Sequence, residues 1–179
     1  NVTLYNYQHT LNIGGNLTVD GTFNMTTAND DGGATVFNGS SQQTISGSGT
    51  TCTFEVVTIS NTSSAGVVLG RNIVLAVSTQ ALTNSDLTVS ANDVFDLSGY
   101  TADRGSAGSG TLTVNAGAAL KIGGTGTFPA NYTSYTLDAS STVIYYGTTQ
   151  TVGAQTYGNL TLSGSGIMTL AATTSIVGN

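Results

Sequence analysis

The residues that could carry catalysis are few and lie far apart along the chain. His9 is the single histidine and Cys52 the single cysteine. We therefore expect no serine–histidine–aspartate triad, no histidine-based zinc site and no internal disulfide. His9 lies in a Tyr-Gln-His-Thr turn, which predicts an exposed side chain. Cys52 lies in the apolar alternation Thr51-Cys52-Thr53-Phe54, which predicts a small buried side chain in a strand.

Acidic and basic residues approach each other most closely between Asp93 and Arg104. This stretch also holds Asp96 and Asp103. A polysaccharide lyase needs a basic residue to abstract a proton, usually beside carboxylates that hold calcium. A glycosidase needs two carboxylates, for which Asp93 and Asp96 are the candidates. Glu55 is the only glutamate, however, and the chain has no tryptophan on which a sugar could stack.

The other two basic residues, Arg71 and Lys121, have no cluster of aspartates beside them. An isopeptide crosslink would need Lys121, the only lysine. A calcium site would fit the acidic stretch Asn29 to Gly33, although a polar turn between strands explains it as well. We therefore predict that the chain is not an enzyme. We assign no catalytic, cofactor-binding or metal-binding residues and expect no cofactor.

Most of the polar side chains in this sequence are hydroxyls and amides. Gly, Thr, Ser and Asn make up half of the 179 residues, and 7% are charged. Asn-x-Ser/Thr motifs are slightly more frequent than chance, and begin at Asn1, Asn16, Asn24, Asn38, Asn61, Asn131 and Asn159. Thr-x-Thr motifs include those that begin at Thr51, Thr111 and Thr125. Rows of threonine on a flat face would indicate ice binding, but these spacings fit no fixed period.

The charge balance limits the partners. Three basic residues against nine acidic ones give a net charge of −6. Nucleic acid and anionic membrane surfaces both require several lysines or arginines, so we expect neither as a partner. The longest apolar run, residues 73–77, is far shorter than a membrane-spanning helix, so we expect no membrane insertion. The chain begins at Asn1 without a visible signal peptide, which suggests a processed chain or an excerpt.

The elements that must position these side chains are short strands. Apolar and polar residues alternate over four or five positions and are followed by Gly, Asn or Ser, as in residues 87–89 and 112–114. About twenty such runs recur roughly every eight residues. No window shows a convincing helical period. In Leu87-Thr88-Val89 we expect Leu and Val to point inward and Thr to point to water.

Irregular repeats connect the two halves of the chain. Residues 35–75 resemble residues 142–179, with Thr35-Val36-Phe37 matching Thr142-Val143-Ile144. Residues 1–23 resemble the segment that follows the first copy, so the N-terminal sequence reads as a continuation of the C-terminal repeat. Three folds fit many short strands: a sandwich, a barrel and a solenoid. We predict one solenoid domain over residues 1–179, with about seven or eight coils of three strands each; the alternative is a β-sandwich. Each coil should take roughly 22 to 25 residues.

Three stretches, residues 110–129, 141–152 and 157–166, resemble the repeat regions of large secreted, adhesin-like β-helix proteins of Bacteroidetes-type bacteria. This resemblance implies a right-handed parallel β-helix, export, and a role at the cell surface or in a fibre. It supplies no catalytic residues. The charged loop Asp103-Arg104 and the tyrosine-rich N-terminus depart from the pattern.

The function expected from these observations is structural. We expect a secreted, extracellular or cell-surface subunit or segment of a fibre, sheath or adhesin. Its end coils lack evident caps, so its expected partner is a second copy, added head to tail. The runner-up is a carbohydrate- or ice-binding solenoid module, which would use surface tyrosines such as Tyr5, Tyr7, Tyr132, Tyr135, Tyr145 and Tyr146 toward surface glycans. A polysaccharide lyase or glycosidase comes third.

Overall fold

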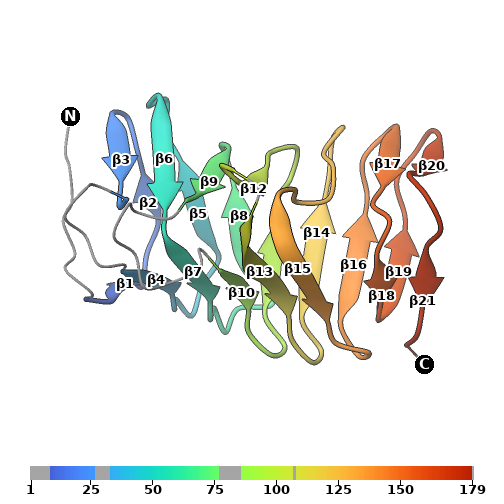
Figure 1. Cartoon of the computed structure of the whole chain (residues 1–179). Coiled ribbons are helices and arrows are strands. Elements are labelled where there is room, and N and C mark those ends of the chain that lie inside the picture. Colours follow the sequence, from blue (N-terminus) through green and yellow to red (C-terminus); the bar gives the residue numbers. More distant parts are fainter. Residues whose placement is uncertain (1–8, 27–32, 77–85, 107, 179) are drawn as a thin grey trace.

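Short strands wind around one axis in successive coils (Figure 1). The structure is a computed structural model that describes residues 9–26, 33–76, 86–106 and 108–178. In this part of the chain there are 21 strands and no helix. Every strand pair is parallel and joins neighbouring coils. The predicted parallel β-solenoid is therefore confirmed, and the pairing excludes a sandwich of antiparallel sheets.

Three sheets run along the rod. Sheet A contains β1 (Leu11–Ile13), β4 (Ala34–Phe37), β7 (Val56–Ile59), β10 (Leu87–Val89), β13 (Ser109–Val114) and β15 (Tyr132–Leu137). Sheet B contains β2 (Leu17–Thr18), β5 (Gln43–Ser46), β8 (Val67–Leu69), β11 (Val94–Asp96), β14 (Ala119–Ile122), β16 (Thr142–Tyr145) and β19 (Asn159–Leu162). Sheet C contains β3 (Thr22–Asn24), β6 (Thr51–Phe54), β9 (Ile73–Leu75) and β12 (Ala102–Arg104).

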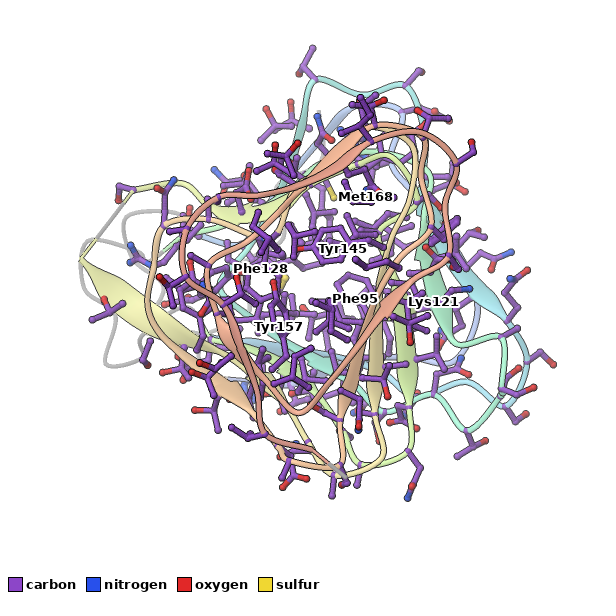
Figure 2. The ribbon with its side chains drawn as sticks, turned by 90° about the vertical axis from the view of Figure 1, so that its right-hand side faces the viewer. Phe95, Lys121, Phe128, Tyr145, Tyr157 and Met168 are labelled. Atoms are coloured by element: carbon purple, nitrogen blue, oxygen red, sulfur yellow. The ribbon has the colours of Figure 1, made fainter. Side chains whose placement is uncertain are left out.

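Two strand pairs complete the C-terminal end. Sheet D contains β17 (Gln150–Val152) and β20 (Met168–Leu170), and sheet E contains β18 (Thr156–Tyr157) and β21 (Ser175–Ile176). In chain order sheet D follows sheet B, as sheet C does elsewhere, and sheet E then occupies the position of sheet A. The rod is therefore three-sided throughout, and Figure 2 shows this outline along its axis.

Side chains alternate between the interior and the surface as predicted. Leu87 and Val89 are fully buried, and Thr88 between them is partly exposed. Because the pairing is in register, Leu87 lies between Val57 and Leu112, and each buried side chain stacks on its equivalent in the next coil. Figure 2 shows this interior filled by side chains that include Phe95, Tyr145 and Tyr157.

The coil length varies more than the sequence suggested. The coil that leads from Val57 to its partner Leu87 is nearly twice as long as the coil that leads from Val143 to its partner Leu160. The expected coil length therefore fails for these two coils, whereas it holds for others, such as the coil from Val89 to its partner Val114. The strands keep their register while the corners take up the difference. Gly66, with φ of 63°, occupies one tight corner, where a side chain would collide with the Val94 carbonyl.

The segment expected as a charged loop at Asp103-Arg104 is strand β12. Asp103 points outward beside Val74, and the side chain of Arg104 is turned inward and 2% exposed. The expectation of a loop at these two residues was therefore wrong. A solenoid accepts them because alternate residues face opposite sides, and the corner next to Arg104 supplies oxygen acceptors for the buried guanidinium.

The two stretches that resemble each other in sequence lie on different faces. Residues 35–45 form β4 and β5, on sheets A and B, whereas residues 142–152 form β16 and β17, on sheets B and D. Likewise β7 of sheet A corresponds in sequence to β19 of sheet B. The second stretch is therefore rotated by one face relative to the first.

Candidate functional site

An ionic cluster lies on the outer surface of sheet B. The Lys121 ammonium is 3.1 Å from a carboxylate oxygen of Asp96. The other oxygen of Asp96 accepts hydrogen bonds from the Tyr146 hydroxyl and the Ser98 amide, each at 2.8 Å. Lys121 also lies 5.2 Å from the centre of the Tyr146 ring. The label of Lys121 in Figure 2 marks this side of the rod.

This cluster binds coils together rather than presenting a reactive group. Asp96, Lys121 and Tyr146 come from three successive coils, on β11, on β14 and just after β16. Burial, followed by the hydrogen bond to Asp96, raises the pKa of the Tyr146 hydroxyl, so this phenol is protonated at neutral pH. Three donors surround the Asp96 carboxylate, and 11% of its side chain is exposed. The carboxylate is therefore engaged by its own protein.

The predicted acidic and basic stretch is divided between two sheets. Asp93 and Asp96 lie at β11 of sheet B, whereas Asp103 and Arg104 lie on β12 of sheet C. Burial raises the pKa of Asp93. The side chain of Asp103 accepts a hydrogen bond from the Ala130 amide at 2.8 Å. Within the described ranges, no three His, Cys, Asp or Glu side chains are grouped so that they could hold a metal ion.

Two of the three basic residues serve as internal braces. Arg71 is 9% exposed and donates to the carbonyl oxygens of Val19 and Gly49, each at 2.7 Å. It thereby ties together the corners of three coils. Arg104 donates to the Ser106 carbonyl and the Ser109 hydroxyl. Neither guanidinium forms an ion pair with a carboxylate of the described residues.

Arg71 also lines an open groove of about 540 Å³ beside sheet C. Thr51, Thr53 and Asn72 line the same groove, together with Tyr100, which is 38% exposed. No sequence pattern indicates this groove, because its lining comes from separate coils. It contains hydroxyl and amide groups but no pair of carboxylates among its described lining residues.

The remaining residues that the sequence suggested as candidates for catalysis or metal binding are placed as follows. His9 is exposed. Cys52 is a free, buried thiol; burial raises its pKa to about 11, although Arg71 nearby acts in the opposite direction. Glu55 is fully buried and accepts a hydrogen bond from the Gly33 amide. The rest of the calcium candidate, residues 29–32, lies outside the described residues.

Glycan-related candidates divide between the interior and the surface. Among the Asn-x-Ser/Thr motifs, Asn61 is fully buried, whereas Asn16, Asn38 and Asn131 are exposed. Most of the described tyrosines that could stack on a sugar are turned inward: Tyr132, Tyr145 and Tyr157 are buried and Tyr135 is partly buried. Tyr5 and Tyr7 lie outside the described residues.

The last coil exposes side chains that would be buried in any other coil. Leu162, Leu170 and Ile176 are 48%, 57% and 58% exposed. They pair in register with Tyr145, Val152 and Tyr157, all of which are fully buried. The apolar stack of the interior therefore reaches the surface of the described coils at this end, where β19, β20 and β21 each pair with one neighbouring strand.

Comparisons with known proteins found no relative of this chain. No protein-family model, no curated protein and no solved structure matches this chain. No helix in the described ranges has the length and apolar character needed to cross a membrane.

Proposed function

We propose that this chain is a non-enzymatic structural protein, a subunit or segment of an extracellular fibre, sheath or surface adhesin. Its rod extends by the addition of further coils to its ends, and the partner is a second copy bound head to tail. The observation that carries the proposal is the end coil, where Leu162, Leu170 and Ile176 continue the internal stack into solvent.

The physical basis is the pairing already present between coils. Each coil binds the next through parallel backbone hydrogen bonds and in-register apolar stacks. Exposed apolar side chains and unpaired strand edges favour a further strand layer. A contact between unlike ends is heterologous, so repeating it produces an open filament.

The phase of the repeats supports the same arrangement. The second repeat lies one face ahead of the first. The N-terminal block Leu17-Thr18-Val19, which matches Leu87-Thr88-Val89 in sequence, is likewise one face ahead, because β2 belongs to sheet B and β10 to sheet A. The second repeat and this N-terminal block are therefore shifted by the same one face relative to the first repeat.

A sparsely charged surface of threonine, serine, glycine and asparagine suits the extracellular location proposed. The ionic cluster around Asp96 and the buried arginines are already engaged in holding coils together. These features support a role in which the scaffold itself is the function.

The test is the assembly state of the chain over a range of concentrations. Sedimentation velocity and negative-stain electron microscopy should show filaments or a concentration-dependent series of oligomers. Leu170→Asp should abolish assembly, since it places a charge in the end stack. Tyr100→Asp is the control, because Tyr100 is exposed on the side of the rod. A wild-type chain that stays monomeric at millimolar concentration would exclude head-to-tail assembly.

A further inference from the structure

An unbroken row of four threonines runs across the outer surface of sheet A. Thr58 on β7 pairs with Thr88 on β10, Thr88 pairs with Thr113 on β13, and Thr113 pairs with Thr136 on β15. All four side chains are at least partly exposed. We call these four residues the threonine ladder. Toward the N-terminus the row continues with Val36 on β4, where the hydroxyls end.

A second row runs beside the threonine ladder, two residues earlier on each strand. It contains Val56, Asp86, Thr111 and Ser134, and the hydroxyls of Thr111 and Ser134 are 2.8 Å apart. The Asp86 carboxylate accepts a hydrogen bond from the Thr111 amide at 2.7 Å, so it is bound to the neighbouring strand. Hydroxyl groups are thus repeated in two directions on β13 and β15.

The backbone sets the spacing of this array. Neighbouring strands lie about 4.8 Å apart, and alternate residues of one strand are about 6.7 Å apart. Parallel hydrogen bonds to both neighbours fix β10 and β13, so the spacing does not depend on flexible side chains. Each threonine presents one methyl and one hydroxyl group, and none of the four rungs carries a charge or an aromatic ring.

We propose that the threonine ladder is an ice-binding face, and that its ligand is the surface of an ice crystal. A ligand that contacts every rung must itself repeat at the strand spacing, and water molecules in hexagonal ice repeat at a closely similar distance along one axis. The hydroxyls supply hydrogen-bonding positions for this water layer, and the methyl groups fit between them. The four ladder side chains are uncharged, which suits an uncharged lattice, and the nearby Asp86 carboxylate is held by the Thr111 amide.

The composition of the face favours ice over a polysaccharide. Sugar rings usually stack on exposed aromatic side chains, and the threonine ladder has none. In the described ranges, sheets B and C lack such a row. On sheet C the row containing Thr53 also contains Asn24, Val74 and Asp103. On sheet B the corresponding row includes Val68, Asp96 and Lys121.

The experiment measures ice growth in the presence of the purified chain. Thermal hysteresis and inhibition of ice recrystallisation are recorded for the wild type, for Thr88→Tyr and Thr113→Tyr, and for Thr53→Tyr as the matched control on sheet C. We expect activity in the wild type, a loss of at least fivefold in both ladder variants, and no change in the control. Circular dichroism and melting temperature establish that each variant is folded.

Three outcomes would overturn the proposal. The first is a folded wild-type chain that leaves ice growth unchanged at millimolar concentration. The second is an equal loss in Thr53→Tyr, which would show that the activity does not belong to sheet A. The third is binding of the wild type to a glycan array with unchanged ice growth, which would assign the face to sugars. The ladder does not involve the end coils, so the Leu170→Asp variant, which tests assembly, should keep its ice activity.

Discussion

Gln43 and Gln150 hold two different corners of the solenoid by the same pattern of hydrogen bonds. The Gln43 carbonyl oxygen accepts from the Gly39 amide at 2.9 Å, and its NH₂ group donates to the carbonyls of Ile13 and Gly15 in the preceding coil. The Gln150 oxygen accepts from the Gly147 amide at 2.7 Å. Its NH₂ group donates to the carbonyls of Ile122 and Gly126.

Replacing Gln43 by leucine should destabilise the fold by about 1–3 kcal/mol, because the Gly39 amide and two carbonyls would lose their buried partner. The free energy of unfolding, measured by urea titration, tests this expectation. Gln42→Leu is the control, since the neighbouring Gln42 is exposed. Equal effects of the two substitutions would show that the Gln43 side chain does not support the corner.

Gly66→Ala should cost about 2 kcal/mol or more. Gly66 has a φ of 63°, and a Cβ there would collide with the carbonyl of Val94 in the next coil. Gly21→Ala should leave the melting temperature nearly unchanged, because no atom lies within 4 Å of a Cβ at that position. If the two variants melt at the same temperature, the corner is less tightly constrained than its geometry implies.

Two substitutions in the ionic cluster should differ in size. Lys121→Met removes one ion pair of a partly exposed side chain, which is worth about 0–1 kcal/mol. Asp96→Ala leaves the Ser98 amide and the Tyr146 hydroxyl without their acceptor, so it should cost about 1–3 kcal/mol. Urea unfolding of both variants measures the difference, and a larger effect of Lys121→Met would contradict the assignment of Asp96 as the centre of the cluster.

The Cys52 thiol should make stability depend on alkaline pH. Its pKa is raised from 9.0 to about 11 in the folded chain, chiefly by burial. A group whose folded pKa is raised stabilises the fold fully below its unfolded pKa and loses this effect as pH rises through the folded value. The stability of the wild type relative to Cys52→Ala should therefore fall between pH 9 and 11, by about 1–3 kcal/mol.

Urea unfolding at intervals of half a pH unit measures this difference. Taking the difference between wild type and variant removes the contribution of the tyrosines, several of which also have raised pKa values. A thiol reagent gives a second readout at pH 8, where Cys52 should react slowly in the native protein and rapidly in urea. A constant difference across the pH range would mean that the thiol ionises as easily in the fold as in the unfolded chain.

Local patterns were sufficient to predict the fold. The alternation in Leu87-Thr88-Val89 and Leu112-Thr113-Val114 indicates which side chains face inward, and the turn residues around these runs separate the strands. The same patterns did not predict strand β12, in which the side chain that faces inward is Arg104. An inward arginine depends on carbonyl and hydroxyl oxygens in nearby corners, which no local pattern reveals.

Surface features that join coils could not be predicted. The threonine ladder brings together Thr58, Thr88, Thr113 and Thr136, whose separations along the chain differ at every step and follow no period. Tyr146 and Asp96 also meet from positions far apart in the sequence. Because each corner has its own length, the partner of an outward residue is known only when the register is known. The Thr-x-Thr motifs therefore do not indicate this row, and only Thr113 of the row belongs to one of them.

The rotation of the second repeat by one face affects any longer rod that has this periodicity. A surface feature carried by each repeat would recur on the next side of the triangle, and then on the third, before returning to the first. In such a rod the equivalent surfaces would follow a helical path around the axis, and they would be accessible from all sides. The accessibility of these surfaces would then not depend on how the rod is rotated about its axis.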